Sequence, residues 1–134
     1  MTRVYASRQG ARFRLECRGH AGYAESGKDV VCAAVSAICQ TLYLWCKNTE
    51  NVTVEDETMG SGVFMLTVRG PCWEPWKAAV LGLMSLEAGY PANIRVDARE
   101  FDLCSKPQTR RRRFRGVRRS RRGRSRDGRD QWRA

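Results

Sequence analysis

The sequence has no hydrophobic segment of the signal-peptide kind near its first residue, where it reads MTRVYASRQGARF. Its longest run without a charged residue, Val30 to Cys46, spans 17 residues and contains Ser36, Gln40 and Thr41. A run of this length is at the short end of what crosses a bilayer, so it favours a buried helix. We therefore expect a soluble, cytoplasmic protein without a membrane partner.

The six cysteines include no CxxC pair. They are Cys17, Cys32, Cys39, Cys46, Cys72 and Cys104. Disulfides are rare in a reducing compartment such as the cytoplasm. We therefore expect free thiols, most of which pack as small hydrophobic residues.

Acidic residues are scarce at the C-terminal end, where 13 arginines from Arg110 to Arg133 are accompanied only by Asp127 and Asp130. This segment accounts for the whole net charge of +11, because residues 1–109 hold 12 basic and 12 acidic side chains. Its apolar content is too low to form a core, so we expect a disordered tail over residues 107–134. Its charge density suits the phosphate backbone of RNA, and a solvated appendage without a partner is the alternative.

Residues 1–106 are expected to form one globular domain. Apolar and charged residues alternate from Arg12 to Arg18, which is the pattern of a strand with one wet face. The other expected strands cover residues 2–6, 51–58, 63–69 and 93–98, with turns at Ser7 to Ala11 and at Gly60-Ser61-Gly62. Helices are expected after Asp29 and from Trp73 to Ala88. The order β-β-α-β-β-α-β predicts an α+β fold, a sheet with two helices packed on one face.

Two groups of apolar residues are expected in the core. The first helix carries a stripe at helical spacing, formed by Val31, Val35, Ile38, Leu42 and Trp45. Trp73 and Trp76 flank Pro75 at the start of the second helix. We expect them to pack in the core rather than to line a peptide groove.

The only histidine, His20, precedes Cys32 by 12 residues, and a glycine-rich loop separates the two. Asp29 occupies the N-cap position of the first helix, so Cys32 falls in its first turn. There the unpaired N–H groups and the helix dipole stabilise a thiolate and can hold the oxyanion of acyl transfer. An imidazole at the end of the preceding strand can accept the thiol proton. The stretch can therefore supply a nucleophile, a general base and oxyanion donors.

Other interpretations of the same residues stay open. Cys32 can be a packing residue, and His20 can be a solvated side chain without a catalytic role. Asp29 can be only a helix cap, and Ser36 can be only a hydroxyl on the helix surface. A metal site is a further alternative, because Cys17 and His20 are spaced as C-x2-H and Cys32 could add a third ligand. The helical cysteines are less suited to one ion, because a spacing of seven residues separates them by about 10.5 Å.

The stretch from Gly19 to Ala37, GHAGYAESGKDVVCAAVSA, resembles the signature of the ribosomal-processing cysteine proteases, the Prp family. The family pattern is G-H-A, a glycine-bearing loop, and then G-x-D-[IV]-[VI]-C-A-A-[VI]-S-A. A looser likeness continues through AAVLGLMSLEAGYPANIRV, where the family has a similar helix before a Tyr-Pro pair. The resemblance extends over residues 2–98.

The resemblance implies a small bacterial α+β domain that forms homodimers. Such proteins remove a short N-terminal extension from large-subunit ribosomal protein twenty-seven, after a paired aromatic motif. Ribosomal RNA then becomes the natural partner of the arginine-rich segment.

The resemblance also assigns roles to residues of the stretch, without a cofactor or a metal. Cys32 becomes the nucleophile and His20 the general base. The supporting positions are Gly19, Asp29 and Ser36. The mobile loop that closes on the substrate contains Gly22, Ser26 and Gly27.

Two matters stay open at this point. A third residue that orients His20 is not identifiable, because capping already occupies Asp29, the nearest candidate. The alternative function is a non-catalytic RNA- or ribosome-binding protein that acts through its arginine-rich tail and has an inert Cys–His pair. Thiol reactivity separates the two functions, because an activated Cys32 reacts with alkylating agents far faster than Cys39 or Cys46.

Overall fold

The computed structural model describes residues 1–98 of the 134-residue chain. The arginine-rich tail predicted over residues 107–134, the domain boundary at residue 106 and Cys104 lie outside the described residues. The elements are β1 (Thr2–Gln9), β2 (Arg12–Arg18), α1 (Val30–Lys47), β3 (Thr53–Gly60), β4 (Val63–Arg69), α2 (Trp73–Gly89) and β5 (Ile94–Asp97). Their order along the chain is the predicted one.

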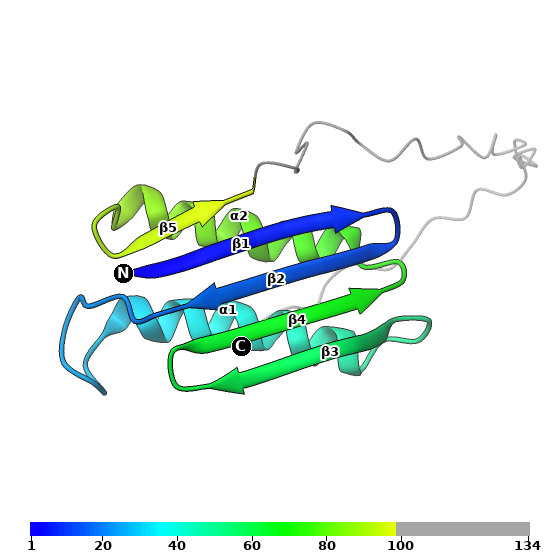
Figure 1. Ribbon diagram of the computed structural model, residues 1–134, viewed down its shortest axis with the longest axis horizontal. Coiled ribbons are helices and arrows are strands. Elements are labelled where there is room, and N and C mark those ends of the chain that lie inside the picture. Colours follow the sequence, from blue (N-terminus) through cyan, green and yellow to red (C-terminus); the bar gives the residue numbers. More distant parts are fainter. Residues whose placement is uncertain (99–134) are drawn as a thin grey trace, which may run out of the picture.

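The strands form one five-stranded sheet in the order β3-β4-β2-β1-β5. Neighbouring strands are antiparallel, except that β1 and β5 run parallel. Both helices cover the same face of the sheet (Figure 1), which confirms the predicted α+β architecture. The C-terminal end of β2 and the N-terminal end of α1 lie at the same end of the domain (Figure 1).

The core face of α1 differs from the predicted stripe. Its buried residues are Val31, Val35, Cys39, Leu42 and Cys46. Steps of three and four residues connect all five, so they form one continuous line along the helix. Trp45 is 36% exposed, and its prediction as a core residue is wrong because Cys46 takes the position that faces the sheet. Ile38 is half-buried.

By length and composition alone, α1 could also cross a membrane, since its 18 residues have a mean hydropathy of 1.5. In the structure, its buried side packs into the core shared by the sheet and α2. Its other side exposes Ser36, Gln40, Thr41 and Lys47. The helix is therefore buried on one side only, with 28% of it buried, and its exposed side also carries the apolar Val30 and Leu44.

The first strand is longer than predicted. A turn over Ser7 to Ala11 is wrong, because β1 continues through residues 7–9, which pair with residues 12–14 of β2. Arg8 interrupts the apolar alternation, so the sequence pattern does not indicate that the strand continues to Gln9. Its guanidinium lies 4.6 Å from the ring centroid of Trp73 and 5.4 Å from that of Phe13. Cation–π contacts thus hold a charged side chain on the inner face of the sheet.

The tryptophans at the start of α2 pack as predicted. Trp76 is 1% exposed, its ring centroid lies 5.3 Å from that of Phe13, and its Nε1–H donates to the Arg14 carbonyl at 3.3 Å. Trp73 is half-buried and packs on Trp76, with 6.1 Å between centroids. Both tryptophans therefore pack in the core, at the end of the sheet opposite His20.

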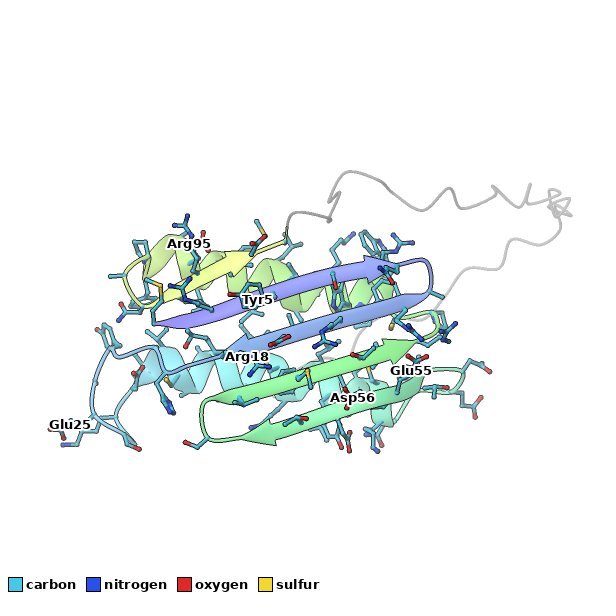
Figure 2. The ribbon with its side chains drawn as sticks, in the orientation of Figure 1. Tyr5, Arg18, Glu25, Glu55, Asp56 and Arg95 are labelled. Atoms are coloured by element: carbon cyan, nitrogen blue, oxygen red, sulfur yellow. The ribbon has the colours of Figure 1, made fainter. Side chains whose placement is uncertain are left out.

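Among residues 1–98, the other face of the sheet carries no helix and exposes charged side chains (Figure 2). Its ion pairs join Arg14 and Arg18 to Glu16, and Arg12 and Arg69 to Glu55. The predicted site residues lie at the edge of the opposite, helix-covered side.

Candidate active site

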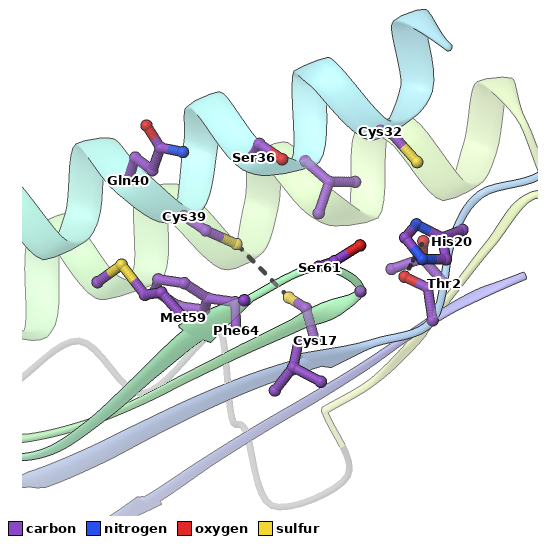
Figure 3. Close-up of a pocket in the computed structure, with 15 residues that line it drawn as sticks. Thr2, Cys17, His20, Cys32, Ser36, Cys39, Gln40, Met59, Ser61 and Phe64 are labelled. Atoms are coloured by element: carbon purple, nitrogen blue, oxygen red, sulfur yellow. Dashed lines mark hydrogen bonds between the residues drawn. The ribbon is translucent and has the colours of Figure 1, made fainter. Parts of the chain in front are cut away.

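A pocket of about 260 Å³ lies between the first half of α1 and the ends of β2, β3 and β4, and both His20 and Cys32 line it. Figure 3 shows the Cys32 sulfur pointing from α1 toward the imidazole of His20, which follows the end of β2. A second hollow of about 510 Å³, on the side of the loop that precedes α1, is lined by the same two residues. The structure therefore brings the predicted nucleophile and base to one place.

Asp29 is the N-cap of α1, as predicted, and both of its carboxylate oxygens accept backbone hydrogen bonds. Oδ1 accepts from the N–H of Cys32 at 2.9 Å. Oδ2 accepts from the N–H groups of Tyr23 at 3.0 Å and Ala24 at 3.4 Å. These hydrogen bonds, the one from Cys32 foremost, hold the pKa of the Asp29 carboxyl below its usual value. Asp29 thus joins the loop to the helix, and its oxygens are not available to orient His20.

The first turn of α1 offers few N–H groups to a ligand. The N–H of Cys32 is taken by the Asp29 side chain, and that of Ala33 donates to the Asp29 carbonyl at 3.1 Å. The N–H groups of Val30 and Val31 belong to the first two helical positions, which have no acceptor within a helix. These two are therefore the donors that the helix start offers to a developing oxyanion.

The sulfur of Cys32 has a backbone donor that the sequence analysis missed. The N–H of Ala21, next to His20, donates to the half-buried Cys32 sulfur at 3.2 Å. Hydrogen bonds of this kind are stronger when the acceptor is charged, so the Ala21 N–H is placed to stabilise charge that develops on this sulfur. No pattern of side chains marks this donor, because every residue except proline has an N–H group.

Two glycines shape the space around His20. Gly19 has a φ of +89°, and a Cβ at this position would lie 2.6 Å from the Met1 carbonyl oxygen, so only glycine fits. Gly62 has a φ of +70° and contacts the imidazole, where a Cβ would lie 2.9 Å from the His20 Nε2. The sequence marks Gly60-Ser61-Gly62 only as a hairpin turn. In the structure, this turn is also a wall of the candidate site.

The end of the pocket away from Cys32 is lined by Met59 and Phe64, together with Cys17 and Cys39, and Gln40 lies beside them (Figure 3). The sulfur atoms of these two cysteines lie 3.5 Å apart. Their hydrogen bond, together with burial, raises the pKa of the Cys39 thiol far above its usual value.

The remaining described cysteines are core residues. Burial raises the pKa of Cys46 to about 11. Burial, with a smaller effect of the neighbouring Cys46, raises the pKa of Cys72 to about 12. Both thiols are therefore protonated at neutral pH, and they pack as the small hydrophobic residues that the sequence predicts.

The other predicted site residues lie around the second hollow. Ser36 lines both hollows, one helical turn after Cys32. Gly22, Ser26 and Gly27 belong to the exposed loop between β2 and α1 and line the second hollow only. Gly22 and Gly27 have φ values of +66° and +84°, which glycine adopts without strain.

Residues 22–28 of this loop make contacts with Asp29 and with Tyr90. Asp29 holds two of its N–H groups, and the ring of Tyr23 makes an edge-to-face contact with Tyr90, with 5.4 Å between centroids. The closing of this loop on a substrate stays a prediction.

No group of three or more His, Cys, Asp or Glu side chains within residues 1–98 is arranged to hold a metal ion. Cys17 faces Cys39 below the pocket, whereas the Cys32 sulfur accepts the Ala21 N–H. The Cys17, His20 and Cys32 side chains considered as a zinc site therefore do not form a common ligand set.

Comparison with known proteins adds a family and a fold. A family model described as cysteine protease Prp matches residues 1–95, and no curated protein sequence matches the chain. An essential ribosomal processing protease Prp from S. aureus, in complex with a covalently linked product peptide, is 20% identical with a TM-score of 0.60, covering 73% of this chain and 99% of that chain. An S. aureus Prp complex with a substrate peptide is 19% identical with a TM-score of 0.58 and the same coverage of 73% and 99%. The structure of SMU.848 from Streptococcus mutans is 24% identical with a TM-score of 0.56, covering 73% and 93%.

We expect Cys32 to be the described cysteine that reacts with iodoacetamide at neutral pH. Its thiol is half-exposed beside backbone donors, whereas the other four described cysteines are buried. In a Cys104→Ser background, mass spectrometry should locate one modification at Cys32, and further modifications should require denaturant. Equal modification of all five thiols in the folded protein would contradict an activated Cys32 and favour an inert pair.

Replacing Gly62 by alanine should displace the imidazole of His20, because the new Cβ would lie 2.9 Å from Nε2. His20 is the only histidine, so NMR can follow its ring signals without assignment, and we expect them to shift. Gly10→Ala is the matched control, since its φ is +59° but nothing lies within 4 Å of the added Cβ. Both variants should lose about 1 kcal/mol of stability through backbone strain. Unchanged ring signals in Gly62→Ala would show that the imidazole does not lie on this turn.

Proposed function

This chain belongs to the cysteine protease Prp family, whose model covers residues 1–95, and we propose that it is an endopeptidase that processes a ribosomal protein. The proposed substrate is the N-terminal extension of large-subunit ribosomal protein twenty-seven, which is removed during ribosome assembly. The observation that carries the proposal is that Cys32 and His20 line one pocket at the start of α1. The S. aureus proteins of similar fold support the substrate class, since they are described as ribosomal processing proteases and bind peptides.

In the proposed reaction, an extended peptide enters between the loop of residues 22–28 and the start of α1. The Cys32 sulfur attacks the scissile carbonyl carbon while the thiol proton passes to His20. The carbonyl oxygen becomes an oxyanion, which the N–H groups of Val30 and Val31 stabilise. His20 then protonates the leaving amine, and the C–N bond breaks to leave an acyl-enzyme.

Hydrolysis of the acyl-enzyme reverses the roles. His20 takes a proton from water, and the water oxygen attacks the thioester carbon. The C–S bond breaks, the carboxylate product leaves, and the proton held by His20 returns to the Cys32 sulfur. In this scheme, contact with Gly62 orients the imidazole, in place of a carboxylate partner.

The shape of the pocket bears on the substrate. Its apolar lining residues Val35, Met59 and Phe64 suit an apolar side chain of the substrate. An aromatic residue of the paired motif, which the family resemblance implies, is the proposed occupant.

An RNA-binding role of the arginine-rich tail is a second proposal, which rests on the 13 arginines between Arg110 and Arg133. Such a tail would hold the enzyme near ribosomal RNA through salt-sensitive phosphate contacts. A chain that ends at Lys106 should lose this affinity, and equal binding by both chains would remove the proposal. If the protein is instead a non-catalytic RNA-binding protein, it should bind RNA while Cys32 is unreactive.

Homodimer formation, which the resemblance implies, is also a proposal. An apolar groove of about 380 Å³ between α1 and α2 is lined by residues that include Ile38, Trp45 and Pro75. Leu44 and Leu81 on the same two helices are 56% and 44% exposed. A second copy would cover such a surface, and the molar mass in solution tests the pairing. A cytoplasmic location stays a prediction.

The Cys32→Ala and His20→Ala variants should lose cleavage of a peptide with the N-terminal extension of the host's ribosomal protein twenty-seven. Removal of either group takes away the nucleophile or its base, and we expect kcat/KM to fall by more than about 10³-fold. The fold should be preserved, because neither side chain belongs to the buried core. Mass spectrometry of the products measures the cleavage, and Cys104→Ala is the matched control. Full activity of Cys32→Ala would overturn the assignment.

A further inference from the structure

Asn93, in the connection between α2 and β5, joins three segments at the active-site end of the sheet. Its N–H donates to the Tyr90 carbonyl at 2.9 Å, and its carbonyl accepts from the Thr2 N–H at 2.9 Å. Its side-chain amide Nδ2 donates to the Ala21 carbonyl at 3.0 Å. The residue therefore connects the end of α2 and the start of β1 to the segment that carries His20.

Ala21 is the point where this connection reaches the nucleophile. Its own N–H donates to the Cys32 sulfur at 3.2 Å, and its carbonyl accepts from Asn93 at 3.0 Å. These groups belong to the two peptide planes on either side of one Cα. When the second plane is held, the first can take only the orientations that the sterically allowed φ and ψ of Ala21 permit. The Ala21 side chain is 2% exposed, and burial further restrains this segment.

We propose that Asn93 is a positioning residue of the reaction: its amide holds Ala21 so that the Ala21 N–H stays directed at the Cys32 sulfur. The inference rests on the proposed role of Cys32 as the nucleophile. Asn93 acts through Ala21 and does not touch the sulfur, so it is not a catalytic residue in the strict sense.

The helix start explains why such a donor is needed. The N–H of Cys32 is already engaged by Asp29, and the remaining N–H groups of the first turn are the proposed oxyanion donors. The Cys32 sulfur therefore takes its backbone donor from outside the helix, from Ala21. A hydrogen bond to an anion is effective only with good geometry, and the Asn93 amide is the side-chain donor that holds the Ala21 carbonyl.

The Asn93→Asp variant tests the proposal, because the two side chains have nearly the same shape. The carboxylate cannot donate and places an oxygen against the Ala21 carbonyl, so the Ala21–Gly22 peptide should rotate away. The alkylation of Cys32 by iodoacetamide, measured against pH in a Cys104→Ser background, is the direct measurement. We expect the rate at pH 7 to fall about tenfold, as for loss of one hydrogen bond to a charged group. The pH at which alkylation reaches half of its maximal rate should rise. In peptide cleavage, the factor by which kcat falls should exceed the factor by which KM changes.

Asn48→Asp is the matched control. The Asn48 amide also donates to a backbone carbonyl, that of Leu44 at 2.7 Å, but at the C-terminal end of α1. Its loss should leave the alkylation profile of Cys32 unchanged. Asn93→His keeps an N–H donor of similar reach and should restore most of the reactivity.

Two results would overturn the proposal. The first is a folded Asn93→Asp variant in which Cys32 reacts as fast as before. The second is an equal loss in Asn93→His and Asn93→Asp, which would mean a general structural role. Should the carboxylate unfold the protein, as judged by circular dichroism, Asn93→Ala takes its place in the same comparison. Alkylation needs no peptide substrate, so it tests the Asn93 proposal independently of cleavage. A chain that has a reactive Cys32 but cleaves no peptide would contradict only the proposed protease function.

Discussion

The carboxylate of Asp29 makes the hydrogen bonds on which the candidate site depends. One oxygen accepts from the N–H of Cys32 and begins α1, and the other gathers the N–H groups of Tyr23 and Ala24 from the preceding loop. Because one short side chain does both, the loop must fold back over the first turn. This brings Ala21 within 3.2 Å of the Cys32 sulfur. The same engagement removes Asp29 as a partner of His20, which leaves the imidazole to be placed by packing on Gly62.

The rest of the site is assembled from segment ends that meet at one end of the sheet. The Gly19 N–H donates to the Gly62 carbonyl at 2.8 Å, which joins the end of β2 to the β3–β4 turn. Thr2 and Asn93 join the starts of β1 and β5. The strand order β3-β4-β2-β1-β5 places β2 in the middle, so its end receives contacts from both sides. Cys32 on a helix and His20 just after the end of a strand are thus held against the same sheet.

The cysteines differ in chemistry because they differ in position. Cys39 and Cys46 lie on the buried face of α1, where the absence of water disfavours a charged sulfur. Cys32, on the first turn of the same helix, is half-exposed at the pocket and has a backbone donor. Of the three thiols on α1, Cys32 is therefore the only one that is not buried. Charge is also divided along the sequence, between the arginine-rich segment from Arg110 to Arg133 and the near-neutral residues 1–109.

Local patterns in the sequence were sufficient to predict the order of the elements, the Asp29 cap and the Cys32–His20 pair. Alternation, helical spacing and capping act over a few neighbouring residues, and the family signature is contiguous. Trp45 and the turn at Ser7 to Ala11 were misassigned, because Cys46 and Arg8 owe their places to packing against distant side chains. The contacts of Gly62 with His20 and of Asn93 with Ala21 were not predictable, since the latter joins residues 72 positions apart. They depend on which strands become neighbours and on backbone donors that are common to nearly all residue types, and neither leaves a trace in local sequence.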